Sequence, residues 1–524
     1  LVMDPRCSTR DAARRSVADE RRSVWQCVAV TECVLAIDLG TGGPKVALVA
    51  ADGRTIAWRS RPVATSFLPG GGAEQDPHEM WSAVVTATRE VLAAVATAPP
   101  IAAVAVTSQY MSTIPIAADG TPTGPCILWM DNCGAAHNAT LLTDDTFTLF
   151  LERHGMIPLP SGHDNVAHAH VLQSRHPAAY AAAVALVEPM DYLTARLTGR
   201  VTATQSTVFG QLACDNRTWG ATEYDADLVA ASRMDPAKLA PLVTMNSIIG
   251  EVRPAVAAEL GLPAGIPVVA GTIDSITSAV GAGALGPTDG SVIIGTTSVL
   301  VSHIAEHRSE IRKGVMAVPS PLTGMYYVMA ENGVGGRALE WAQRLFGYEA
   351  VEDALADALA VDADGVQFLP WLLGSVAPRP NDDVRAAYVG LSLQHDRRHA
   401  VRATLEGVAV NLAWLLPAVE SFVGGAFPFL RFGGGGAQSP LWAQLLADAT
   451  DRPVHRLAEP RATNARGAAF LAFAALGVLD LADVPSLLQT AQVHDPEPST
   501  RPHMRDALAA HAALHPALSS LSSH

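Results

Sequence analysis

The chain has 524 residues, more than one hydrophobic core usually supports, so at least two packed domains are expected. Hydrophobic residues make up 49% and charged residues 17%, which is typical of a globular protein and excludes a disordered or fibrous one. The 51 aspartates and glutamates outnumber the 36 lysines and arginines, and the net charge of −15 argues against nucleic acid and anionic membranes as partners.

The first 32 residues are expected to form a flexible extension. Their apolar stretch, 24–30, is short and is soon followed by Glu32, so it lacks the core of a secretory signal. The six cysteines are scattered without a C-x-x-C pair, which is typical of free thiols in a reducing compartment. Prolines and charges break the other apolar runs, so we expect no membrane span and a cytoplasmic location.

The folded part is predicted to open with strands. A β-rich run at 33–37 leads through a glycine-rich turn into a second run at 46–50, and Asp52-Gly53 signals a tight turn before a third strand. An amphipathic helix is predicted at 81–96 and a buried strand at 101–106. This alternation continues through the first half of the chain and indicates a layered α/β domain.

The second half repeats this opening, because β-rich runs at 291–294 and 299–301 flank a turn at 295–298. The chain is therefore predicted to contain two related halves. Further elements are expected in this order: a helix at 336–346, a helix from 399 to about 416 ended by Pro417, a strand at 429–432, a glycine run at 433–436, and helices from 440 and at 463–476. The end of the chain, 491–524, is expected to be a peripheral tail.

The first glycine-rich turn is a candidate phosphate site. Glycines such as Gly42 and Gly43 let successive backbone N–H groups converge on an anion, and Thr41 and Lys45 add a hydroxyl and a charge. Asp38 could hold Mg²⁺ through water beside a nucleotide. A plain β-turn is the alternative, and this loop alone favours it.

The second half supplies similar turns. Gly295 and Thr296 form another hydroxyl-lined hairpin turn, and two opposed phosphate loops predict a nucleotide between the domains. The glycine run 433–436 lies between a strand and a helix, where a flat base could lie against bare backbone; a flexible linker is the alternative. A P-loop is excluded, because no lysine of the chain follows a glycine.

Asp274 lies where a buried strand gives way to a predicted helix. An aspartate in this position is commonly the N-cap of the helix, and position alone favours that role. The functional alternative places the carboxylate at the floor of a cleft, where it accepts the proton of a hydroxyl that attacks the γ-phosphate of ATP.

Between residues 34 and 479 there are nine short motifs whose order and spacing along the chain are informative. They are 38–41, 73–77 with Trp81, 128–131, 188–193 with 197–199, 270–274, 368–371 with 390–391, 402–407, 434–442 and 467–469. Together they resemble the FGGY carbohydrate kinases, and most of all the xylulokinase-like members of that family.

The resemblance implies an α/β fold of two actin-like (ribonuclease H-like) domains with an ATP cleft between them. The N-terminal sugar-binding domain is expected at 33–286 and the C-terminal nucleotide-binding domain at 287–490. The implied activity is ATP-dependent phosphorylation of a hydroxyl of a small sugar or polyol, with a ketopentose such as xylulose as the expected acceptor. ATP and Mg²⁺ are the implied cofactors, with Mg²⁺ bridging the phosphates.

The resemblance also implies roles for individual residues. Asp274 would be the general base and, with Asp38, would hold the metal. The nucleotide would meet Thr41, Gly42, Gly43, Lys45, Gly295, Thr296, Gly336, Glu340, Gly435 and Ser439. The acceptor would meet Gln109, Tyr110, Met111, Trp129, Asp274 and Ser275.

Some positions depart from the family pattern. Tyr110-Met111 stands where xylulokinases usually carry Met-His, Cys133 stands where arginine is common, and Gly42-Gly43 removes a hydroxyl from the first loop. These departures motivate the alternative of a catalytically weak sugar- or nucleotide-binding pseudokinase with a regulatory role. An Hsp70-like ATPase is a second alternative, but too few residues follow position 479 for a client-binding domain. Whether the protein is a homodimer is left open.

Overall fold

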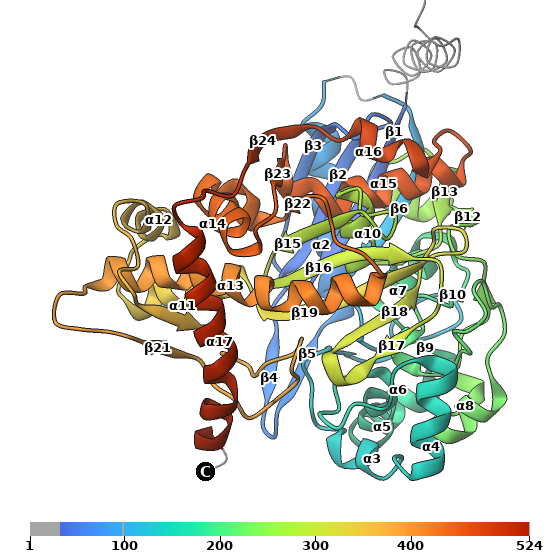
Figure 1. Ribbon diagram of the computed structural model, residues 1–524. Helices are drawn as coiled ribbons and strands as arrows, with labels where there is room; N and C mark the ends of the chain where they lie inside the picture. Colours follow the sequence, from blue (N-terminus) through green and yellow to red (C-terminus); the bar gives the residue numbers. More distant parts are fainter. Residues whose placement is uncertain (1–31, 97–98, 523–524) are drawn as a thin grey trace, which may run out of the picture.

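The computed structural model describes residues 32–96 and 99–522, so the predicted N-terminal extension lies, apart from Glu32, outside the described residues. Two large sheets stand beside each other with helices between and around them (Figure 1). The first has the strand order β12-β13-β6-β1-β2-β3, with β14 paired to β6. Its strands are β1 (Cys33–Gly40), β2 (Gly43–Ala50), β3 (Thr55–Ser60), β6 (Ile101–Ser108), β12 (Ile248–Glu251), β13 (Pro267–Val269) and β14 (Thr272–Ile273).

The second sheet has the order β17-β18-β19-β16-β15-β22-β23-β24. Its strands are β15 (Gly290–Ile294), β16 (Thr297–Ile304), β17 (Ser309–Glu310), β18 (Val315–Pro319), β19 (Tyr326–Val334), β22 (Leu430–Gly433), β23 (Val454–Leu457) and β24 (Thr490–His494).

The centres of the two sheets follow one plan. In the first, β1 pairs antiparallel with β2 and parallel with β6, and β2 continues antiparallel to β3. In the second, β15 pairs antiparallel with β16 and parallel with β22, and β16 continues antiparallel to β19. The predicted α/β fold with two related halves is therefore confirmed.

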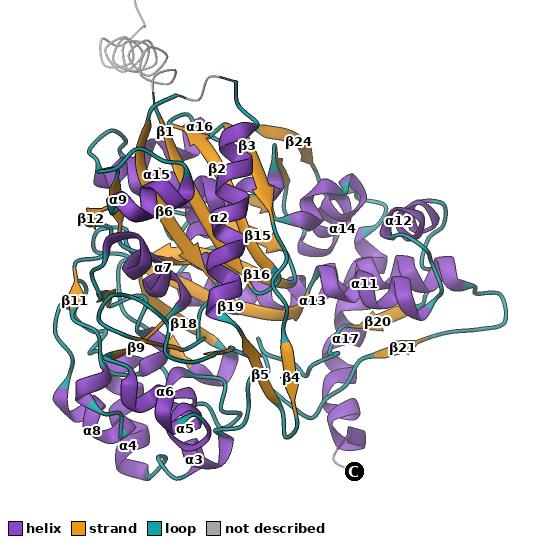
Figure 2. Cartoon of the chain, turned by 180° about the vertical axis from the view of Figure 1, so that it is seen from behind, coloured by secondary structure: helices purple, strands orange, loops and turns teal. Residues whose placement is uncertain are grey.

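Helices cover both faces of the first sheet. On one face, α2 (Pro77–Ala93) packs against β2 and β3, with α7 (Pro189–Thr198) and α9 (Pro254–Leu260) beside it (Figure 2). On the other face lie α10 (Asp274–Gly281) and α15 (Thr463–Ala475). Helix α15 comes from the second half of the chain yet packs against β1, β2 and β6, so it completes the core of the first domain.

The crossing of α10 and α15 depends on two glycines. A Cβ atom on Gly281 would lie 1.9 Å from the carbonyl oxygen of Thr463, and one on Gly467 would lie 1.8 Å from that of Thr277. Both distances are far below van der Waals contact, so only glycine permits this approach. Because α10 begins at Asp274, the crossing fixes the position of that residue.

Helix α13 (Arg397–Val423) corrects one expectation, because it continues past Pro417 for almost two turns. Val419 and Phe422 of this last segment are buried, so packing outweighs the local cost of the proline. Among the described helices, α13 is long and apolar enough to cross a membrane, but 72% of its most apolar window is buried inside the protein, as in a core helix.

The C-terminal segment is more than the peripheral tail that the sequence predicts. Helix α17 (Arg501–Ser522) packs along α13 and α14 (Figure 1). His511 and His515 are buried on its inner side, with the ring of His511 4.9 Å from Trp371 and that of His515 5.2 Å from Trp414. Because it packs against α13 and α14, α17 is part of the second domain. Its buried face carries histidines, and the helix contains a proline, so a simple apolar pattern does not predict it.

Shorter elements complete the two domains. The first domain adds β4 (Ser66–Leu68), β5 (Gly72–Gln75), β7 (Ile114–Ile116), β8 (Cys126–Ile127), α3 (Ala135–Ala139), α4 (Asp144–Leu149), α5 (Asn165–Arg175), α6 (Pro177–Ala182), β9 (Ala185–Val187), β10 (Ala203–Thr204), α8 (Ala226–Ser232) and β11 (Leu242–Val243). The second adds α11 (Gly336–Leu345), α12 (Val351–Leu359), β20 (Gln367–Leu369), β21 (Ala387–Val389), α14 (Pro440–Thr450) and α16 (Val484–Leu487).

Candidate active site

The first hairpin places an acid opposite a base. Asp38 is buried near the end of β1, and the strand register sets it directly opposite Lys45 on β2. The Lys45 ammonium lies 3.6 Å from the Asp38 carboxylate and is half exposed. Lys45 can therefore partly neutralise Asp38 and still turn towards an anion at the mouth of the hairpin.

The two glycines of this turn serve different purposes. Gly43 has φ +119°, and a Cβ atom there would lie 2.1 Å from the carbonyl oxygen of Arg61, so the close approach of the neighbouring chain requires glycine. A Cβ atom on Gly42 would have nothing within 4 Å. Only Gly42 therefore leaves open space in which a ligand could lie against the backbone.

Asp274 does not act as the cap of its helix. The N-cap of α10 is Ile273, without a side-chain hydrogen bond, and Asp274 is the first helical residue. The Ser275 hydroxyl donates to its carboxylate at 3.3 Å. Burial first, and then the charge of Asp38, raise the pKa of Asp274 to about 7, against the opposing effects of Ser275 and Lys45. Its carboxylate is thus tuned for proton transfer near neutral pH.

Asp38 is near enough to Asp274 for its charge to raise the pKa of Asp274. Within residues 32–96 and 99–522, no group of three or more His, Cys, Asp or Glu side chains could form a metal cage. Mg²⁺ is usually held by one or two carboxylates together with water and substrate phosphates. The pair therefore fits a magnesium ion that arrives with a nucleotide.

Thr41 connects the first hairpin to the side chains predicted to bind the acceptor. Its hydroxyl donates to the Gln109 amide oxygen at 2.6 Å and accepts from the Trp129 indole N–H at 3.0 Å. Gln75 donates to the Thr41 carbonyl at 2.7 Å. Sequence reasoning missed Gln75 as a site residue, although it lies in one of the motifs that carried the resemblance. The hydroxyl assigned to phosphate is thus also a positioning group.

Removing the Thr41 hydroxyl should weaken the acceptor site. In Thr41→Val, the Trp129 N–H and the Gln109 oxygen lose their partner, and each buried unsatisfied group costs about 1–3 kcal/mol. We expect the KM for the acceptor to rise about tenfold or more. Thr41→Ser keeps the hydroxyl and should stay close to wild type in steady-state kinetics. A valine variant with an unchanged KM would show that this hydrogen-bond chain does not position the acceptor.

Tyr110 and Met111 follow Gln109 in a strained loop. Met111 has φ +54°, an uncommon conformation for this residue type that functional sites often hold. The Glu188 carboxylate accepts the next backbone N–H, that of Ser112, at 3.0 Å. Burial raises the pKa of Glu188 well above its usual range. Sequence reasoning missed this role of Glu188, which only its place in a family motif could have indicated.

Three glycine segments of the second domain meet beyond the end of β15. The N–H of Gly336, at the start of α11, donates to the carbonyl oxygen of Gly295 at 2.8 Å, and that of Gly335 donates to Thr296 at 3.1 Å. A Cβ atom on Gly434 would lie 2.5 Å from the carbonyl oxygen of Ile294. The structure therefore brings together the three glycine segments of the second domain that the sequence assigned to the nucleotide.

The remaining residues predicted to bind the nucleotide are exposed or have a structural role. Glu340 is exposed on α11. The Ser439 hydroxyl accepts the backbone N–H of Trp442 at 3.2 Å and so caps α14, a structural role that sequence reasoning did not assign. Gly435 is exposed, and a Cβ atom there would touch only the Ile294 carbonyl, at 4.0 Å.

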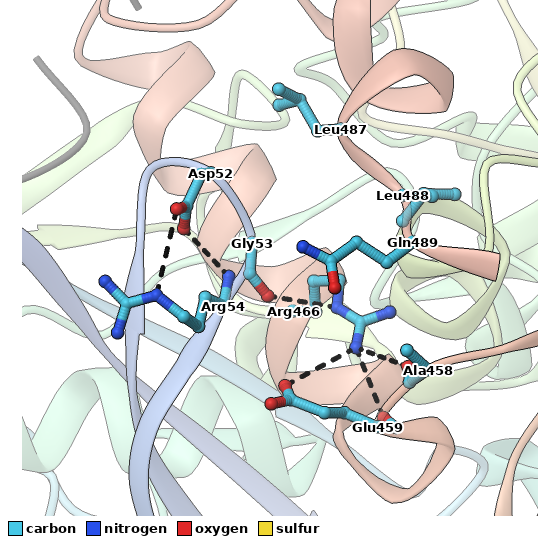
Figure 3. A pocket seen from close by; sticks show the side chains of 9 residues that line it. All are labelled: Asp52, Gly53, Arg54, Ala458, Glu459, Arg466, Leu487, Leu488 and Gln489. Carbon is cyan, nitrogen blue, oxygen red and sulfur yellow. Dashed lines mark hydrogen bonds and ion pairs between the residues drawn. The ribbon is translucent and has the colours of Figure 1, made fainter. Parts of the chain in front are cut away.

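A cavity of about 80 Å³ lies elsewhere at the domain junction, between the β2–β3 turn and the segment after β23 (Figure 3). The buried Arg466 guanidinium donates to the carbonyl oxygens of Gly53, Ala458 and Glu459. These bonds join the two domains. None of the predicted site residues lines this cavity.

Two domains built on one plan, each with a hairpin turn at the centre of its sheet, define the class of two-domain actin-like ATPase folds. The chain belongs to the FGGY family of carbohydrate kinases. The N-terminal domain of that family matches residues 33–281, and its C-terminal domain matches residues 290–476. The enzyme is therefore an ATP-dependent sugar kinase.

Individual relatives include kinases of neutral and of acidic sugars. A xylulose kinase from Klebsiella pneumoniae is 28% identical over 471 residues, which cover 88% of this chain and 94% of the relative. A gluconokinase from Bacillus licheniformis is 26% identical over 492 residues, covering 89% and 92%. The crystal structure of a xyloylose kinase from Brucella ovis superposes with a TM-score of 0.82 at 27% identity, covering 93% of this chain and all of that one.

Proposed function

We propose that this chain transfers the γ-phosphoryl group of ATP to a hydroxyl of a small sugar or polyol, with a ketopentose such as xylulose as the expected acceptor. The observation that carries the proposal is the Asp274 carboxylate. It is free of the helix cap, lies beside Asp38, and has its pKa raised to about 7. A carboxylate with that pKa can accept a proton from an attacking hydroxyl at neutral pH.

In the proposed mechanism, Gln109, Trp129 and Met111 hold the acceptor in the first domain. The backbone and side chains of the two hairpin turns, at Gly42 with Lys45 and at Gly295 with Thr296, hold the phosphates of ATP. Closure of the domains excludes water and aligns one hydroxyl between Asp274 and the γ-phosphate. Asp274 removes the proton of that hydroxyl as it attacks. Asp38 and Asp274 would hold Mg²⁺, which would supply positive charge against the phosphates.

The pH dependence of the reaction should follow Asp274. Only the ionised carboxylate accepts a proton, so we expect kcat/KM to fall as the pH drops through about 7. The positive charge of Lys45 lowers the pKa of Asp274, so Lys45→Met should shift the midpoint upwards. The measurement is a profile of kcat/KM between about pH 5 and 9 for both proteins. A midpoint near the ordinary value for aspartate in wild type would contradict the assignment.

The proposed function is tested by measuring ADP release over a panel of ketopentoses, ketohexoses and polyols. With at least one acceptor, we expect the enzyme to release ADP in proportion to the sugar phosphate formed. The pseudokinase alternative, motivated by the departures at Met111, Cys133 and the first loop, predicts no turnover with any of them. Product analysis by mass spectrometry distinguishes phosphoryl transfer from ATP hydrolysis.

A further inference from the structure

Strand β19 presents a second wall to the acceptor region, opposite Tyr110. Side chains two residues apart lie on one face of a strand, so Tyr327, Met329 and Glu331 point the same way. The Tyr110 hydroxyl donates to the Met329 sulfur at 2.7 Å, across the junction of the two domains. Strand β19 also contacts α10, the helix that begins at Asp274. This face of β19 therefore borders the predicted acceptor pocket.

The Glu331 carboxylate on this face has no partner. It is partly buried and makes no hydrogen bond or ion pair with any residue in the described part of the chain. Burial raises the pKa of Glu331 to about 7. Burial first, and then the charge of Glu331, raise the pKa of the Tyr110 phenol. A partly buried carboxyl group without a partner destabilises the folded state. Its presence therefore indicates a function other than stability.

The charges around the pocket are mainly negative. Asp274 and Glu331 are the charged groups that act on Tyr110. The Lys45 ammonium is already 3.6 Å from Asp38 at the phosphate end. Arg175, which acts on Cys133, is exposed. An acceptor that carries a carboxylate would therefore be repelled by Asp274 and Glu331.

We propose that Glu331 is a specificity-determining residue, which selects an uncharged ketose or polyol and rejects an aldonate of the same carbon skeleton. The proposal rests on the proposed kinase function and deepens it. The Glu331 carboxylate accepts a hydrogen bond from a hydroxyl of the neutral acceptor and repels the carboxylate of an aldonate. The relatives include xylulose kinases and gluconokinases. In the present chain, Glu331 selects between a neutral acceptor and an acceptor that carries a carboxylate.

The test compares acceptors that differ only at C1, namely xylitol with D-xylonate and D-glucitol with D-gluconate. For wild type and Glu331→Gln, kcat/KM is measured for both pairs at pH 8, above the raised pKa of Glu331. Glu331→Asp keeps the charge, and Glu352→Gln removes an exposed glutamate of α12 as the matched control. Dissociation constants for the same probes, measured by calorimetry with a non-hydrolysable ATP analogue, give a second readout that needs no turnover.

Wild type should favour the neutral member of each pair. Glu331→Gln should raise the aldonate-to-polyol ratio about 10- to 100-fold, in kcat/KM or in affinity, while the KM for ATP stays within about twofold. Glu331→Asp and Glu352→Gln should keep the wild-type ratio. A preference for aldonates in wild type, an unchanged ratio in Glu331→Gln, or no binding of any probe would overturn the proposal. Failure of the kinase function itself would instead appear as probe binding without ADP release.

Discussion

Replacing Asp274 with asparagine should lower kcat by about 10²- to 10⁴-fold and leave the affinity for ATP nearly unchanged. Asparagine has almost the same shape but cannot accept the proton of the attacking hydroxyl. In the proposed mechanism the nucleotide is held mainly by backbone and hydroxyl groups of the hairpin turns, which this change does not touch. Steady-state kinetics with the acceptor found in the screen, together with nucleotide binding by calorimetry, make the comparison.

Stability gives an independent check on the same variant. The pKa of Asp274 is raised to about 7 in the folded protein from an ordinary value of 3.8. The folded state therefore binds this proton more tightly, and the carboxyl makes folding less favourable as the pH rises from about 4 to 7. Asp274→Asn should raise Tm more at pH 8 than at pH 5. Asp353→Asn, also in the first turn of a helix but exposed on α12, is the control for both measurements. Wild-type kcat in Asp274→Asn would reject the base assignment.

The Gly467→Ala substitution should cost about 3 kcal/mol in the free energy of unfolding, an unusually large effect for a single methyl group. The new Cβ atom would lie 1.8 Å from the carbonyl oxygen of Thr277, so one helix backbone must move away from the other. Both helices are buried between the sheets and cannot shift without disturbing the core. Because α10 carries Asp274, kcat should fall as well.

The matched control for this substitution is Gly425→Ala. Gly425 has nothing within 4 Å of an added Cβ atom and lies in the exposed turn after α13. Chemical denaturation of the two variants should show a large loss for Gly467→Ala and almost none for Gly425→Ala. Equal stabilities would show that α10 and α15 do not pack as closely as described.

Local signals were sufficient to predict the two hairpin turns that we propose hold the phosphates. The alternation of β-rich runs and glycine turns predicted both hairpins, and the strand register now places Asp38 opposite Lys45 as that hairpin requires. The position of Asp274 at a strand-to-helix junction was likewise visible, but its function was not. An N-cap and a catalytic base look the same in sequence, and only the helix geometry shows that Ile273 takes the cap position.

Long-range packing decided what local patterns could not. Pro417 led us to predict the end of a helix, but α13 continues past it because its last residues are buried. Helix α17 packs against α13, and this was not predicted because histidines occupy its buried face. The same limit applied to the acceptor site. Tyr110 and Met329 are 219 positions apart, and their contact brings β19, which carries Glu331, next to the segment predicted to bind the acceptor. No window of sequence contains both.

The sequence by itself therefore determined the class of fold, the two hairpin turns and the family, because turn chemistry and strand periodicity act between residues a few positions apart. Tertiary structure alone decided which side chains share the cleft, and with them the raised pKa of Asp274 and the unpartnered Glu331. Burial and the distance between charges set those properties, and both arise only when remote segments pack together.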